Sequence, residues 1–122
     1  MTYWDNICQT ELNKQINREY EASLYYHQLS TLFNNHDEAE PILSDYFNKC
    51  SLEEREHADM LMKYQTKRGG TVELGSIAQP IVTFETNNKI LESFLKVLEL
   101  EKKIYKNIIH LCTIADNSKD SH

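Results

Sequence analysis

At residues 53–58 the chain reads Glu53-Glu54-Arg55-Glu56-His57-Ala58. Glu54 and His57 stand three residues apart, a spacing that places both side chains on one face of an α-helix. Read outward in alternating steps of three and four, that face is a mostly apolar seam: Leu43, Phe47, Cys50, Glu54, His57, Leu61 and Tyr64. An unpaired buried carboxylate costs several kcal/mol, so a glutamate on such a seam indicates a counter-charge or a metal ion.

Two further segments carry the same anomaly. The first runs from about Asn6 to Asn34, and its seam is Leu12, Ile16, Glu19, Ser23, Tyr26, Ser30 and Phe33. The last starts near Asn88, and its seam is Ile90, Phe94, Val97, Glu101, Ile104, Ile108, Leu111 and Ala115. Seams of this period predict three amphipathic helices, each with its acid near mid-length. Three acids at one depth, with a histidine beside the second, predict a bound cation.

The breaks between the helices are marked by short local signals. Asn34-Asn35-His36-Asp37 interrupts the first segment, and Pro41 suits the first turn of the second helix. Gly69-Gly70 predicts the end of that helix after Arg68. We expect an irregular connection from Thr71 to about Asn88, with a short strand-like piece near residues 72–74. The third helix should fade at residues 116–118.

The connection lengths predict the topology. A short first break favours an antiparallel pair of helices. The second connection, of roughly eighteen residues, could span nearly 60 Å when extended. The second helix, at about 28 residues, would measure only about 42 Å. The connection can therefore return along the whole bundle, which favours an up-down-down arrangement.

Composition sets broad limits on the class of protein. The 122 residues are enough for one domain, 40% of them are hydrophobic, and the formal net charge is −6. This charge argues against a nucleic-acid partner and suits a protein that attracts cations. The sequence has no apolar run near the length of a membrane span, and its start resembles no secretory signal. Cys8, Cys50 and Cys112 lack paired spacing, which favours reduced thiols in a cytoplasmic protein over disulfides or zinc.

A carboxylate and an imidazole together suit a first-row metal such as iron better than calcium or zinc. Other interpretations of each residue stay open. The run at residues 53–57 could be a solvated charged face, and Glu19 or Glu101 could pair with a Lys or Arg of a neighbouring helix. Tyr26 could be an amphipathic core tyrosine or a phenol that orients a metal ligand.

The residues that carry this pattern resemble those of the ferritin family, specifically the catalytic heavy-type chains of animals. The matching stretches are residues 15–19 with 22–23, 53–58 with 61–63, 67–70, and 100–102. The resemblance implies a ferritin-like all-α bundle with a di-iron centre and ferroxidase activity, in which Fe²⁺ is oxidised by oxygen and stored as Fe³⁺ mineral inside a shell of several ferritin subunits.

The resemblance also implies a role for each matched residue. Glu19, Glu54 and His57 correspond to ligands of the first iron, with Glu54 placed to bridge, and Glu101 to the ligand of the second. Tyr26 corresponds to the catalytic tyrosine beside the centre. A sixth residue, Glu53, matches a further acid near that site.

The family also has a fourth long helix, which supplies a glutamine near the second iron, and a short fifth helix. The sequence ends at His122, so we expect residues 1–122 to be a C-terminally incomplete ferritin-like domain, whether a fragment or a short variant. Its uncovered apolar stripe should favour association. Three functions remain open: a ferroxidase, a non-catalytic chain that co-assembles with or modulates complete subunits, and a structural bundle whose seam acids form ion pairs.

Overall fold

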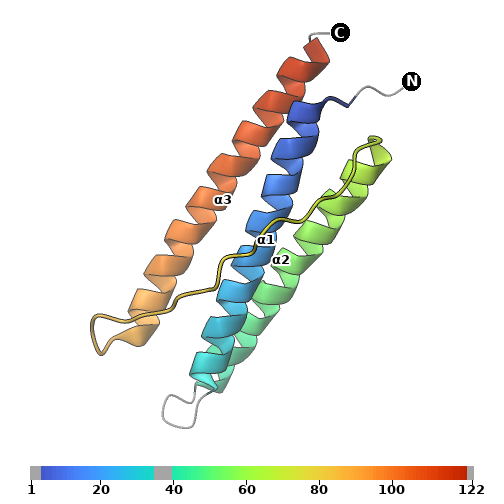
Figure 1. Ribbon diagram of the computed structural model, residues 1–122. Helices are drawn as coiled ribbons and strands as arrows, with labels where there is room; N and C mark the ends of the chain where they lie inside the picture. The colour runs from blue at the N-terminus through green and yellow to red at the C-terminus, as the bar shows by residue number, and fades with distance from the viewer. Residues whose placement is uncertain (1–3, 35–39, 121–122) are drawn as a thin grey trace.

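The computed structural model describes residues 4–34 and 40–120, with the side chains given up to residue 117. They form three helices, α1 (Asn6–Phe33), α2 (Pro41–Lys67) and α3 (Lys89–Asp120), and no strand (Figure 1). The all-α prediction is confirmed, and the helix bounds were predicted to within about two residues. One exception is the end of α3, which continues through residues 116–118 instead of fading there. Most of the predicted break after Asn34 lies outside the described residues.

The helix ends follow from local chemistry. The Asp5 carboxylate caps α1 by accepting the backbone N–H of Cys8 at 2.7 Å. Pro41 occupies the first turn of α2, where its missing N–H costs no hydrogen bond. Gly69 ends α2 with a φ of 85°, a left-handed conformation that a glycine adopts without strain.

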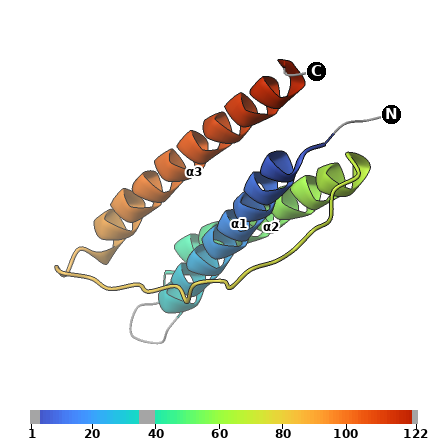
Figure 2. The same cartoon turned by 45° about the horizontal axis from the view of Figure 1, so that its top comes forward.

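The arrangement is up-down-down, as predicted. α1 runs antiparallel to α2 and to α3, which are parallel to each other (Figure 1). α1 packs along both other helices, whereas α2 and α3 touch little, and Figure 2 shows them separated on either side of α1. Their few contacts include Phe94, whose ring lies 6.1 Å from Tyr46 and 5.6 Å from Phe47 between centroids.

Small polar residues let α1 and α2 approach closely. Ser23 and Ser51 each donate their hydroxyl to the other's backbone carbonyl, at 2.8 and 2.7 Å. Ser30 and Ser44 form the same pair of hydrogen bonds nearer the end of α1, both at 2.8 Å. These reciprocal bonds give each of the four serine hydroxyls a hydrogen-bond acceptor. Larger side chains at these positions would push the two helix backbones apart.

The connection over residues 71–88 is fastened to α1 by four polar side chains at intervals of four residues. Gln9 accepts the N–H of Thr71, and Asn13 donates to the carbonyl of Thr71. One and two turns further, Asn17 accepts the N–H of Gly75 and Glu21 that of Ala78, both at 3.3 Å. We call this row the crossover ladder. It lays the connection along α1 and so carries the chain back to the start of α3.

The prediction of a short strand-like piece near residues 72–74 is wrong. That segment has no secondary structure in the described chain. Its neighbours in sequence bond to side chains of α1, and a helix side-chain row cannot supply the backbone partner that a strand needs.

None of the described helices combines the length and the hydropathy that a membrane span requires.

The crossover ladder should contribute measurably to stability. Asn13 is buried and also accepts the Gln65 amide at 3.0 Å, so Asn13→Ala removes two hydrogen bonds. We expect a loss of about 1–3 kcal/mol in the free energy of unfolding. The exposed neighbour Lys14 is the matched control, because its ion pair with Glu11 is at the surface and Lys14→Ala should cost well under about 1 kcal/mol. Urea denaturation followed by circular dichroism measures both, and equal effects would contradict the role of the ladder.

Candidate metal centre

Glu19 lies at mid-length of α1 with only 1% of its surface exposed. One carboxylate oxygen, Oε1, accepts the side-chain amide of Gln15 at 3.1 Å. The other, Oε2, is buried and has no hydrogen-bond partner. A buried carboxylate that is half satisfied is unfavourable unless a cation joins it.

Glu54 faces Glu19 from α2 and is 6% exposed, and its Oε2 is also buried without a hydrogen-bond partner. The imidazole of His57 joins the two acids. Its Nδ1 lies 3.4 Å from Oε2 of Glu54 and 3.8 Å from Oε2 of Glu19. One ligand atom from each of the three residues can be chosen so that all lie within 4.8 Å of one another. Two carboxylate oxygens and one ring nitrogen are therefore grouped closely enough to share one metal ion.

The electrostatics of the pair differ from those of a surface acid. Burial first, then the close contact with Glu19 and its negative charge, and then Glu101, raise the pKa of Glu54 to about 9. Two close carboxylates cannot both be ionised cheaply, so Glu54 keeps its proton at neutral pH when no cation is present. A divalent ion would remove this penalty and take the proton's place.

Glu101 brings the third predicted acid to the same region from α3. Its Oε1 accepts a short hydrogen bond from the hydroxyl of Tyr26. Burial and the contact with Glu101 raise the pKa of the Tyr26 phenol, which therefore stays protonated and donates. Glu101 is not among the three converging residues, but its charge acts on Glu54. The predicted residues thus form a group of three with Glu101 beside it, held by Tyr26.

Glu53, the weaker prediction from the resemblance, is exposed and lies outside the converging group. Gln15 was not singled out from the sequence, although it is fully buried and fixes Glu19. The signal that could have found it is its position one helical turn before Glu19, where an amide can reach the carboxylate.

One side of the centre opens into an apolar groove. His57 belongs to the seam but has 53% of its side chain exposed, because α2 and α3 stand apart there. The groove has a volume of about 450 Å³ and reaches Glu19 and His57. Val97 and Ile104 of α3 are buried against α1, whereas Ile108, further along the same seam, stays 38% exposed. The third seam is therefore only partly covered, and its uncovered part belongs to the apolar stripe that the sequence led us to expect.

Ion pairing does not account for the buried acids. In the described part of the chain, the ion-pair partner of Glu19 and of Glu54 is His57, with no Lys or Arg. Arg18, the nearest arginine in sequence to Glu19, donates instead to Gln15 at 3.0 Å. Carboxylate and imidazole donors without a fixed counter-charge suit a first-row transition metal.

The group of Glu19, Glu54 and His57, with Glu54 and His57 in an E-x-x-H pair and Glu101 nearby on α3, resembles part of the ligand pattern of the di-metal carboxylate bundles. The chain belongs to the ferritin family, whose sequence model, described as a ferritin-like domain, matches residues 9–122.

Two curated relatives agree with this assignment. The chain is 40% identical over 121 residues to Ferritin-4, chloroplastic, of Arabidopsis thaliana, covering 98% of this chain and 47% of that protein. It is 39% identical to Ferritin-1, chloroplastic, of Nicotiana tabacum, covering 98% and 48%. The chain thus spans about half the length of these curated relatives. These relatives are plant proteins, so the narrower resemblance to animal heavy-type chains stays a prediction.

The fold is similar to a solved ferritin as well. A crystal structure of ferritin from the multicellular green alga Ulva pertusa superposes with a TM-score of 0.91 at 40% identity. The match covers 97% of this chain and 62% of that one. The three-helix arrangement is therefore the ferritin-like one predicted from the sequence.

Glu54→Gln should have opposite effects with and without metal. Because its pKa is raised in the folded state, Glu54 contributes its full stabilisation at pH values below about 4.5, its pKa in the unfolded chain. That contribution is lost as the pH rises toward about 9. In chelator at pH 7.5 the variant should therefore be more stable than the parent by roughly 1 kcal/mol, or about 3–6 °C. With Co²⁺ present, the parent should gain stability and the variant should gain little. Calorimetry at pH 5, 7.5 and 9 measures this, and a variant less stable than the parent in chelator would contradict the account.

Proposed function

We propose that this chain is a ferritin subunit that binds Fe²⁺, oxidises it with molecular oxygen and passes the Fe³⁺ on for storage. The observation that carries the proposal is the pair of buried, unpartnered carboxylate oxygens of Glu19 and Glu54 beside His57. Ferrous iron is the substrate in this proposal. Membership of the ferritin family supports it.

Each side chain has a distinct part in the proposed reaction. Glu19, Glu54 and His57 hold the first iron, and the central place of Glu54 lets it share a second ion with Glu101. Gln15 orients Glu19 through its amide, and Tyr26 orients Glu101 through its hydroxyl. Hard carboxylate oxygens favour the ferric state over the ferrous one, which lowers the potential of bound iron and promotes its oxidation.

The proposed reaction balances as a two-electron step. Two Fe²⁺ ions lose one electron each, and one O₂ takes up these two electrons and two protons to give hydrogen peroxide. Glu54 holds a proton before metal binds, because its pKa is raised, and loses it when a cation takes its place. The exposed face of His57 leaves a side of the centre open for oxygen or water.

Assembly and location form part of the same proposal. Storage of mineral requires a shell, so the proposed partners are other ferritin subunits. The sequence favoured the cytoplasm, whereas the names of the relatives place those proteins in chloroplasts. We retain the cytoplasm as the proposed compartment, and the compartment does not affect the chemistry of the centre.

A second candidate function is a non-catalytic chain that co-assembles with complete subunits and modulates them. The observation that favours it is the open apolar groove between α2 and α3, which leaves the centre uncovered on one side. Exposed apolar side chains on one face are typical of a surface that another polypeptide covers.

Oxygen uptake after addition of Fe²⁺ tests the first candidate. The purified chain should consume oxygen, and Glu54→Ala or His57→Ala should slow the uptake at least roughly tenfold, since each removes a ligand of the first iron. Glu56→Ala is the matched control, because Glu56 is an exposed acid of the same helical turn. A rate unchanged in the ligand variants, or equally reduced in the control, would rule out this centre.

The same assay separates the two candidates. If the chain alone shows no uptake but forms mixed oligomers with a complete ferritin and changes its rate, the second candidate holds. Size-exclusion chromatography with light scattering reports the mixed oligomers independently of turnover.

A further inference from the structure

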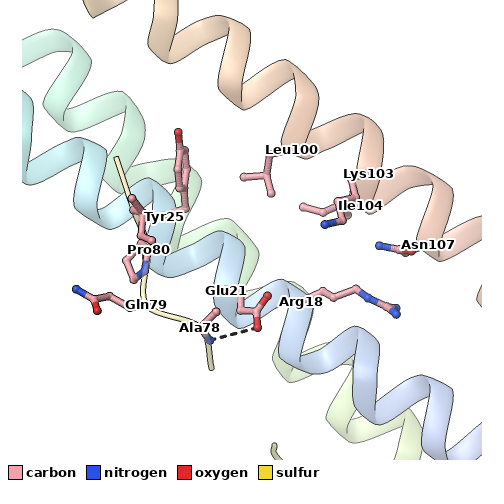
Figure 3. A pocket seen from close by; sticks show the side chains of 11 residues that line it. Arg18, Glu21, Tyr25, Ala78, Gln79, Pro80, Leu100, Lys103, Ile104 and Asn107 are labelled. Atoms are coloured by element: carbon pink, nitrogen blue, oxygen red, sulfur yellow. Dashed lines mark hydrogen bonds between the residues drawn. The ribbon is translucent and has the colours of Figure 1, made fainter. Parts of the chain in front are cut away.

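A second cavity, with none of the lining residues of the metal centre's groove, lies where the connection passes from α1 to α3. We call it the crossover pocket. It has a volume of about 330 Å³, within the range of small-molecule sites. Three segments far apart in the sequence supply its walls: residues 18–25 of α1, residues 78–81 of the connection and residues 100–107 of α3 (Figure 3).

The pocket occurs where the crossover ladder ends. The ladder advances along α1 in steps of four residues, and its last rung is the bond from the Ala78 N–H to Glu21. The next position in that row is Tyr25, whose ring lines the pocket beside Pro80 in Figure 3. Proline has no N–H to donate, so a further rung cannot form at that residue. The connection therefore bridges an open space there instead of lying against the helix.

One end of the crossover pocket is cationic and polar. Arg18 of α1, with Lys103 and Asn107 of α3, extends into the space between the two helices (Figure 3). Neither cation has a carboxylate within ion-pair distance in the described chain, whose described ion pairs involve other residues. The lining holds these two cations and one acid, Glu21, so its charged groups are net positive although the whole chain carries −6. Their summed field favours an anion in that space.

Arg18 is also held in place before any ligand arrives. Its Nη1 donates to Oε1 of Gln15 at 3.0 Å, and Gln15 is fully buried and donates in turn to Glu19. One nitrogen of the guanidinium is thus fixed by the bundle, and the remaining N–H donors are available for an oxyanion. A fixed guanidinium loses less entropy on binding than a mobile lysine, and it can make bidentate bonds to phosphate.

Part of the remaining pocket wall is apolar, although Gln79 and Glu21 also line it. The apolar residues that line the cavity are Pro80 and Ile81 of the connection and Leu100 and Ile104 of α3. The acid that lines it, Glu21, directs its Oε1 to the backbone N–H of Ala78, which partly offsets its charge (Figure 3). A cationic end and an apolar wall within one cavity match a ligand with an anionic head and an apolar body.

We propose that the crossover pocket binds an organic phosphate ester. The phosphate is held by Arg18 and Lys103 with the Asn107 amide, and the apolar group of the ester packs against Pro80, Ile81 and Leu100. This site is separate from the metal centre and does not depend on the proposed ferroxidase function.

Titration calorimetry with three probes tests this proposal. Phenyl phosphate carries both the head and the body, inorganic phosphate carries the head alone, and phenol carries the body alone. Phenyl phosphate should bind at least roughly tenfold more tightly than either part, because both halves of the pocket contribute. Tighter binding of phenol would instead assign the pocket to neutral apolar ligands and overturn the proposal.

Matched variants locate the binding. Arg18→Gln should weaken phenyl phosphate binding by roughly tenfold or more, and Lys103→Gln by a few-fold, while phenol binding stays unchanged. Lys106→Gln is the control, because Lys106 lies on the same helix outside the pocket and loses the same charge. Arg18→Lys keeps the charge but loses the planar guanidinium that can make two hydrogen bonds to one phosphate. Its affinity for phenyl phosphate should lie between those of the parent and of Arg18→Gln.

Circular dichroism checks that each variant is folded. The proposal is overturned if phenyl phosphate does not bind at millimolar concentration, or if Lys106→Gln weakens it as much as Arg18→Gln does. It is also overturned if the fully folded Arg18→Gln and Lys103→Gln variants retain the affinity of the parent.

Discussion

The close approach of two buried carboxylates, Glu19 and Glu54, is the constraint on which the rest of this structure depends. Each has one oxygen without a hydrogen-bond partner, and the raised pKa of Glu54 limits the repulsion between the two acids in the metal-free protein, because Glu54 keeps a proton. Apolar residues at both positions would pack at lower cost, so the pair is unfavourable for stability by itself. Its geometry becomes favourable when a cation with high affinity for oxygen lies between the three helices.

Several other features follow from the need to hold that geometry. The serine pairs bring α1 and α2 close enough for His57 to reach both acids. The crossover ladder returns the chain along α1, so that α3 begins at the same end as α2 and presents Glu101 near Glu54. The ladder also creates the crossover pocket where it ends. Gln15 belongs to both regions, since it binds Arg18 on one side and Glu19 on the other.

Much of the fold was predictable because its signals are local and repeated. The seam period gave three helices, Pro41 and Gly69 gave two of their ends, and the length of the second connection gave the parallel placement of α2 and α3. Glu19, Glu54, His57 and Glu101 were identified because an acid or histidine on an apolar seam contradicts its surroundings. Sequence similarity to the ferritin family then supplied the expected roles, which local patterns alone leave open.

The remaining features depend on contacts between segments distant in sequence. A connection whose backbone bonds to helix side chains and a β-strand have the same local sequence pattern. For this reason a strand was wrongly predicted near residues 72–74. The exposure of His57 and of Ile108 follows from the separation of α2 and α3, which a seam cannot report. The four rungs at Gln9, Asn13, Asn17 and Glu21 form a polar row on α1 whose partners become evident only in three dimensions.

The most direct test of the central claim is the position of bound metal. Crystals of the chain grown with Co²⁺ or Fe²⁺ and measured at the metal's absorption edge give its location from anomalous scattering. We predict one peak bounded by Glu19, Glu54 and His57, and a second between Glu54 and Glu101. Metal found elsewhere, or a centre in which Glu19 and Glu54 remain without a cation at saturating metal, would contradict it.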